Sequence, residues 1–174
     1  MTKIEQKIIK FLSDYPAREF YGQEIVEKIK CSKGSANGIL KALYAKKIVF
    51  KQTRGHMKFY QINLDHPEIK RFKIDSALEA MQPIVIKLEK IASKIVMFGS
   101  ASRGEQTAES DFDLLVLTNH KEQVRSIINK MKQAARIKPI VKTPSEWSET
   151  EIKEPEFYQE VKRGILLHNY VSRI

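Results

Sequence analysis

Two acidic residues and a Gly-Ser pair have the types and spacing needed for phosphate and metal chemistry. Gly99-Ser100 is followed a short way along the chain by Asp111 and Asp113. Residues two apart in a strand point to the same face, so the two carboxylates converge and offer the oxygen ligands that Mg²⁺ or Mn²⁺ prefers. Gly99 lets backbone N–H groups approach a phosphate, and the Ser100 hydroxyl can hydrogen-bond a phosphate oxygen. The pattern predicts a site for a nucleoside triphosphate (NTP) with a divalent metal.

The segments around these residues form a strand–turn–strand frame. Residues 93–98 are apolar enough for a buried strand that ends at Gly99, and residues 111–117 predict a second strand. Residues 120–135 predict a helix, and residues 136–143 the next strand. The tail predicts a closing helix and a short apolar strand.

Three short motifs carry a specific resemblance. Gly99-Ser100, Arg103-Gly104-Glu105 and Ser110-Asp111-Phe112-Asp113 resemble the signature of the minimal nucleotidyltransferases of the DNA polymerase β-like superfamily. The resemblance covers about residues 76–170. It implies a small mixed sheet flanked by helices and transfer of a nucleoside monophosphate (NMP) from an NTP, expected to be ATP, with divalent metal. It also implies that Asp111 and Asp113 are catalytic metal ligands and that Gly99, Ser100, Arg103 and Ser110 bind the nucleotide.

The later part of the chain departs from this family pattern. Active members carry a third carboxylate on a later strand, but residues 136–143 contain no acid. Lys138 and Lys142 lie where that acid is expected, either to bind triphosphate or as solvated strand residues. Glu146 or Glu149 is an alternative third acid, although acids are also favoured at a helix start. The loss of this carboxylate weakens metal binding and removes a candidate base.

The first third of the chain predicts a different module. Ile4, Ile8, Phe11, Leu12 and Tyr15 have helical spacing that ends near Pro16. A second helix is expected to include Phe20 to Ile29, and Ser32 to cap a third. Two strand-like segments, 48–53 and 57–62, surround a turn at Gly55. This order resembles the winged helix-turn-helix modules of prokaryotic transcription regulators over residues 2–64.

A winged helix places its third helix against double-stranded DNA. Its outward face is expected to hold Gly34, Asn37, Gly38, Lys41 and Ala45. Lysines at the edge suit phosphates, an asparagine suits a base edge, and the hairpin tip suits the DNA backbone or minor groove. The expected DNA-binding residues are Lys33, Ser35, Asn37, Lys41, Arg54 and His56. A module used only for protein contacts is the alternative.

Charge and composition limit the function classes. The net charge is +10, and residues 1–65 hold 13 Lys and Arg against 6 Asp and Glu. A basic module suits nucleic acid, or is a solubilising surface. The single cysteine, Cys31, excludes an internal disulfide. No apolar run reaches membrane-spanning length and no secretory signal is evident, so no membrane partner and a cytoplasmic location are expected.

The expected fold class is α+β, in three parts. Residues 1–65 form the winged helix-turn-helix, 66–92 a connecting helix, and 93–174 the small mixed-sheet nucleotidyltransferase-fold domain. In the connecting helix, Ile74, Leu78, Met81, Val85, Leu88 and Ala92 make a coiled-coil-like stripe, with Pro83 expected to kink or split it. The stripe packs either on its own domain or in a homodimer.

Three functions fit these observations. The first is a DNA-binding regulator whose second domain binds NTP and Mg²⁺ and transfers NMP to a protein or small-molecule hydroxyl. The second is a regulator with a degenerate nucleotidyltransferase domain that only senses nucleotide. The third is an antitoxin-like partner of a separate HEPN-type protein, because minimal nucleotidyltransferases are often paired with such toxins.

Overall fold

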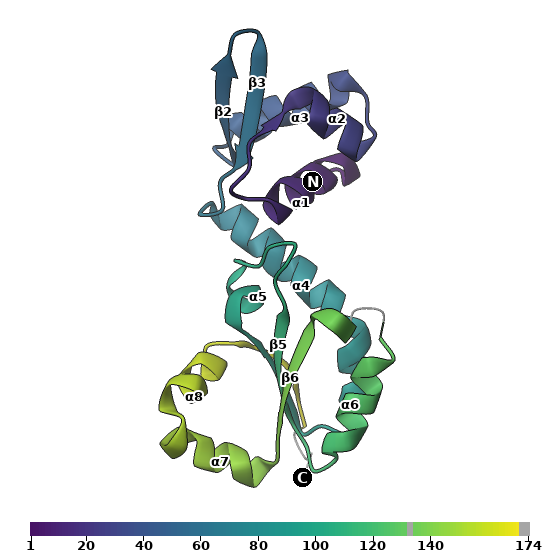
Figure 1. The fold of residues 1–174 in the computed structure, drawn as a ribbon, viewed down its shortest axis with the longest axis vertical. Coiled ribbons are helices and arrows are strands. Elements are labelled where there is room, and N and C mark those ends of the chain that lie inside the picture. Colours follow the sequence, from purple (N-terminus) through teal and green to yellow (C-terminus); the bar gives the residue numbers. More distant parts are fainter. Residues whose placement is uncertain (132–133, 171–174) are drawn as a thin grey trace. The chain divides into compact units, whose positions relative to one another are not determined.

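The computed structural model describes residues 1–131 and 134–170, which divide into two compact units, Met1–Lys73 and Ile74–Ile174. Each unit has its own core and its own sheet (Figure 1). None of the helices in the described part of the chain has both the length and the apolar character that a bilayer span requires.

The first unit contains three complete helices, the first residues of a fourth, and a three-stranded antiparallel sheet of order β1-β3-β2. Thr2 caps the first helix in a reciprocal capping box with Glu5, and Ser32 accepts the N–H of Ser35 at the start of the third. The hairpin turns at Gly55, whose φ is +60°. The elements are α1 (Lys3–Asp14), β1 (Phe20–Tyr21), α2 (Gly22–Ile29), α3 (Lys33–Ala45), β2 (Val49–Arg54) and β3 (Met57–Ile62).

Phe20 lies in strand β1, so the sequence prediction of a helix from this residue was wrong. Phe20 pairs with Tyr60 of β3, and its ring lies 4.5 Å from that of Phe11. Only 3% of Phe20 is exposed. Pairing with a distant strand and burial against α1 therefore override the local helical spacing.

The second unit begins within α4 (Pro67–Leu88) and is built on a mixed sheet of order β6-β5-β4-β7. Strands β5 and β6 are parallel, while β4 is antiparallel to both β5 and β7. The remaining elements are β4 (Lys94–Phe98), α5 (Gly99–Arg103), β5 (Phe112–Leu117), α6 (Lys121–Asn129), the 3-10 helix η1 (Ala134–Arg136), β6 (Ile137–Lys142), α7 (Pro144–Lys153), α8 (Pro155–Lys162) and β7 (Ile165–Asn169).

Alternate residues of β4 and β5 bury their side chains on opposite faces of this sheet. Ile95, Met97, Leu114 and Val116 belong to a core shared with α4 and α6. Val96, Phe98, Leu115 and Leu117 pack instead with Trp147 and Phe157 of α7 and α8. Helices therefore cover both faces, α4 and α6 on one side and α7 and α8 on the other (Figure 1).

The connecting helix differs in part from its prediction. It continues through Pro83 to Leu88 without a break. Met81 and Leu88 are fully buried in the second core, and Leu78 and Val85 pack against it. The stripe thus packs largely on its own unit.

Two further elements differ from expectation at their ends. Helix α6 ends at Asn129, earlier than the predicted residue 135, and residues 132–133 of that prediction lie outside the described part. Strand β6 runs from Ile137 to Lys142, one residue shorter at each end than the predicted 136–143. It is an edge strand that contains Pro139 opposite Leu114. A proline fits a strand only where its nitrogen faces away from the neighbouring strand.

Candidate functional site

Asp113 lies against Gly99 at the junction between β4 and α5. Asp113 is paired with Phe98, the last residue of β4, and Gly99 follows with a φ of +69°. A Cβ atom added to Gly99 would lie 2.5 Å from Oδ2 of Asp113. Glycine is therefore required at position 99 for two reasons: the positive φ, and the close approach of the Asp113 carboxylate.

Asp111 and Asp113 flank a buried residue, so both side chains leave the core that Phe112 enters. Phe112 belongs to the α4 and α6 side of the sheet. Asp113 therefore faces the side that α7 and α8 cover. Burial raises the pKa of Asp113 above its ordinary value, and the negative charges of Asp111 and Glu160 raise it further. The site thus gathers carboxylate charge that has no full compensation.

Lys138 lies beside this acidic pair. It is the register partner of Asp113 in the parallel strand β6, and its Nζ is 2.9 Å from Oδ2 of Asp111. This hydrogen bond raises the pKa of Lys138. An ammonium group therefore lies next to the acids, near the place where the family resemblance implies a third acid. Lys142 lies opposite Leu117, at the other end of the strand.

Arg103 at the end of α5 is engaged with acids. Its Nε donates to Glu105 at 2.8 Å, and its Nη1 is 3.6 Å from Glu160 of α8. The hydrogen bond to Glu105 is the main cause of its raised pKa. Sequence reasoning missed Glu160, because only the packing of α8 brings it to Asp113. A cavity of about 540 Å³ opens between the two helices, lined by Ser102, Arg103, Pro155, Glu156, Gln159, Glu160 and Arg163.

The two serines of the motif differ in setting. Ser100 is half-buried in α5, and its carbonyl accepts the N–H of Glu105 at 2.9 Å. The Ser110 hydroxyl accepts the N–H of Thr107 at 2.8 Å, and the Ser110 carbonyl accepts a hydrogen bond of the same length from Arg136. Ser110 therefore shapes the loop that delivers Asp111 to the site.

A family model supports what these residues indicate. The model described as a nucleotidyltransferase domain matches residues 78–168, more than half of the chain, and the match includes Gly99, Asp111 and Asp113. The chain belongs to the nucleotidyltransferase domain family. No curated protein matches it.

The carboxylates of Asp111 and Asp113 fit one Mg²⁺ ion that is bound partly by the protein and partly by a nucleotide. Such an ion takes one or two carboxylates and completes its shell with phosphate oxygens and water. Asp111 and Asp113 meet this need on one side of β5, and a cation there would relieve the repulsion that raises the pKa of Asp113. Within residues 1–131 and 134–170, no three His, Cys, Asp or Glu side chains are grouped closely enough to hold a metal by themselves.

Glu146 and Glu149 do not supply the third acid of the nucleotidyltransferase domain, so that alternative was wrong. Both lie in α7, beyond the far end of β6 from Lys138. The six residues of β6 span about 20 Å. Glu149 pairs with Lys153 at 2.6 Å, well away from Asp111.

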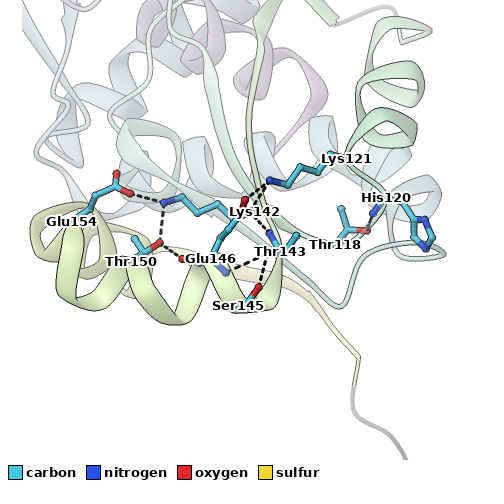
Figure 2. A network of polar contacts seen from close by, with 9 residues as sticks. All are labelled: Thr118, His120, Lys121, Lys142, Thr143, Ser145, Glu146, Thr150 and Glu154. Atoms are coloured by element: carbon cyan, nitrogen blue, oxygen red, sulfur yellow. Dashed lines mark hydrogen bonds and ion pairs between the residues drawn. The ribbon is translucent and has the colours of Figure 1, made fainter.

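The polar groups at that far end form a structural network (Figure 2). Both oxygens of Glu146 accept hydrogen bonds from Lys121 at 2.7 Å, and this pairing, with the N–H of Thr143, lowers the Glu146 pKa to about 2. Lys142 donates to Thr150 and to Glu154. These contacts fasten α7 to the ends of β6 and α6.

In the first unit, α3 exposes the residues that the sequence assigns to DNA contact. Lys33, Asn37 and Lys41 are exposed, and no atom lies within 4 Å of a Cβ built on Gly34 or Gly38. Ser35 is half-buried, and its N–H is taken by the cap at Ser32.

The hairpin tip is only partly available. His56 is exposed in the turn after β2. Arg54 is also exposed, but its guanidinium pairs with Glu19 and Gln52 and lies over the ring of Phe59. Contact between Arg54 and a phosphate would therefore require exchange with Glu19.

Proposed function

We propose that the chain is a cytoplasmic DNA-binding regulator whose nucleotidyltransferase domain binds an NTP with Mg²⁺. The first unit supports the DNA-binding part through its element order, in which a short strand precedes α2 and the sheet order is β1-β3-β2. This order favours a winged helix-turn-helix, in which α3 would be the recognition helix and the β2–β3 hairpin would be the wing.

One observation carries the proposal of DNA binding. Residues 28–64, which include α3, β2 and β3, contain nine Lys and Arg and no Asp or Glu. Eight of these nine residues lie outside any ion pair with a carboxylate among the described residues, and Arg54 is the exception. A surface of one sign next to an exposed helix favours the phosphates of double-stranded DNA.

Selection of genomic fragments, followed by sequencing at fixed salt, tests this proposal. We expect an enriched sequence, and we expect Lys41→Gln to lower the slope of log affinity against log salt by about 0.9 for the lost phosphate contact. Lys10→Gln is the matched control, since Lys10 is exposed on α1 and pairs with Asp14. No enrichment, together with equal slopes for the two variants, would overturn DNA binding.

The second domain supports nucleotide binding through three of its own parts. Asp111 and Asp113 would hold Mg²⁺, and Gly99 lets the Asp113 carboxylate lie against the start of α5. When bound, the ion neutralises phosphate charge. Calorimetry with ATP and Mg²⁺ tests this part, and the Asp111→Asn/Asp113→Asn variant should lose binding. Equal heats from this variant and the wild type would refute it.

NMP transfer to a hydroxyl of a protein or small molecule is the second candidate. It is favoured by the match to the nucleotidyltransferase domain family and by the close approach of Asp113 to the Gly99 turn. The place of a third acid is taken by Lys138, which leaves the site without an evident base. Labelled NTPs with Mg²⁺ or Mn²⁺ and cell extract test for transfer, and labelling no greater than with the double variant excludes it.

A further inference from the structure

The Lys138 ammonium group competes with any incoming cation for the carboxylates of Asp111 and Asp113. Its Nζ is 2.9 Å from Asp111, and its strand position places it directly beside Asp113. The Lys138 side chain is 65% exposed, so it can leave Asp111 by rotation without disturbing the core. The backbone of Lys138 is held in β6 at the edge of the site, while its charged side chain is free to move.

This charge affects a bare metal ion and a metal–nucleotide complex in opposite ways. A free divalent cation must displace the ammonium from Asp111 and then remain close to it, which costs Coulomb energy. A metal–NTP complex carries net negative charge and brings phosphate oxygens that can accept the displaced ammonium. Among the described residues, no third carboxylate is grouped with Asp111 and Asp113 closely enough to ligate the same ion.

We propose that Lys138 is a specificity-determining residue that makes the site take the metal–nucleotide complex in preference to the free metal ion. Lys138 pairs with Asp111 when no ligand is bound and moves to a phosphate oxygen of the triphosphate when the complex binds. This inference rests on the proposed binding of NTP and Mg²⁺. It assigns to Lys138 a role opposite to that of the acid it replaces, which would attract free metal.

The expected effect of Lys138 is moderate, because its ion pair is exposed to water. Lys138→Gln removes both the ion pair with Asp111 and the screened repulsion between the ammonium group and a divalent ion. We therefore expect Lys138→Gln to bind free Mn²⁺ about three to ten times more tightly than the wild type. The same change should weaken binding of the metal–nucleotide complex, because the phosphate loses its partner.

Direct binding measurements on the full chain test the inference without reference to turnover. Free Mn²⁺ is followed by its electron paramagnetic resonance signal, and Mg²⁺ with the α,β-methylene analogue of ATP by calorimetry. The proteins are the wild type, Lys138→Gln, Asp111→Asn and the control Lys153→Gln. Lys153 is also an exposed, ion-paired lysine of the same unit, bound to Glu149.

The inference expects the preference for the nucleotide complex over free Mn²⁺ to fall in Lys138→Gln and to be unchanged in Lys153→Gln. If both ligands bind the wild type and Lys138→Gln keeps the same preference, the role of Lys138 is overturned while nucleotide binding stands. If neither ligand binds the wild type or Lys138→Gln, the proposed function fails and the inference with it. If only Lys138→Gln binds free Mn²⁺, the inference is supported.

Discussion

Replacement of Gly99 by alanine should disrupt the site through one identifiable atom. The added Cβ would lie 2.5 Å from Oδ2 of Asp113, and Gly99 has a φ of +69°. The left-handed backbone costs alanine about 1–2 kcal/mol. Turning the Asp113 side chain away from its rotamer costs about 0.5–1.5 kcal/mol more. We therefore expect Gly99→Ala to lower the free energy of unfolding by about 1.5 to 3.5 kcal/mol.

Trp147 provides the probe for this measurement. It is the single tryptophan, and it lies in the second unit against Phe157 and Tyr158. Urea unfolding followed by its fluorescence therefore reports on the nucleotidyltransferase domain. Gly99→Ala should also lose affinity for Mg²⁺ with NTP, because the carboxylate of Asp113 is displaced.

A double-mutant cycle separates the backbone effect from the clash. In an Asp113→Ala background the Oδ2 atom is absent, so Gly99→Ala should cost only the backbone part, about 1–2 kcal/mol. If Gly99→Ala costs the same in both backgrounds, the carboxylate of Asp113 does not lie against Gly99, and the reasoning about the site is refuted.

Three further predictions concern charge and the loop before the site. The pKa of Glu146 is lowered to about 2, chiefly by Lys121, so its ion pair stabilises the fold at neutral pH and is lost as the pH falls through that value. Glu146→Gln should therefore show a weaker dependence of unfolding on pH between 4.5 and about 2. Burial raises the pKa of Asp113, so its ionised form opposes folding; Asp113→Asn should be more stable than wild type at neutral pH, and should lack the wild-type gain on acidification. Arg136→Met loses the bonds to the Ser110 carbonyl and should lower the free energy of unfolding by about 1.5–3 kcal/mol in the Trp147 assay.

The local hydrophobic pattern was sufficient to predict β4, which ends at Gly99, and β5, which contains Asp113. The two-residue period of β5 places Asp113 on the face opposite Phe112, whereas Asp111 lies directly before the strand and pairs with Lys138. Local pattern failed at Phe20, where pairing with Tyr60 decides the conformation. It also failed at the end of α6, because apolar spacing extends past the residue where the helix stops.

The partners of the acids depend on contacts that spacing does not determine. Lys138 was identified as lying near the place of an expected acid, but its ion pair with Asp111 follows from the parallel register of β5 and β6. Glu160 lies far along the sequence on a helix whose apolar residues determine how it packs. Glu146 was a candidate by residue type alone, and the length of β6 removes it from the site.

Pro139 has a consequence for how the domain behaves in concentrated solution. It lies in the middle of an edge strand, and because proline has no backbone N–H, the open edge of that strand lacks one hydrogen-bond donor. Exposed lysine at the neighbouring position 138 adds charge to the same edge. An edge with a missing donor and a cation is a poor template for a strand from another molecule, so β6 resists the edge-to-edge stacking that leads to aggregation.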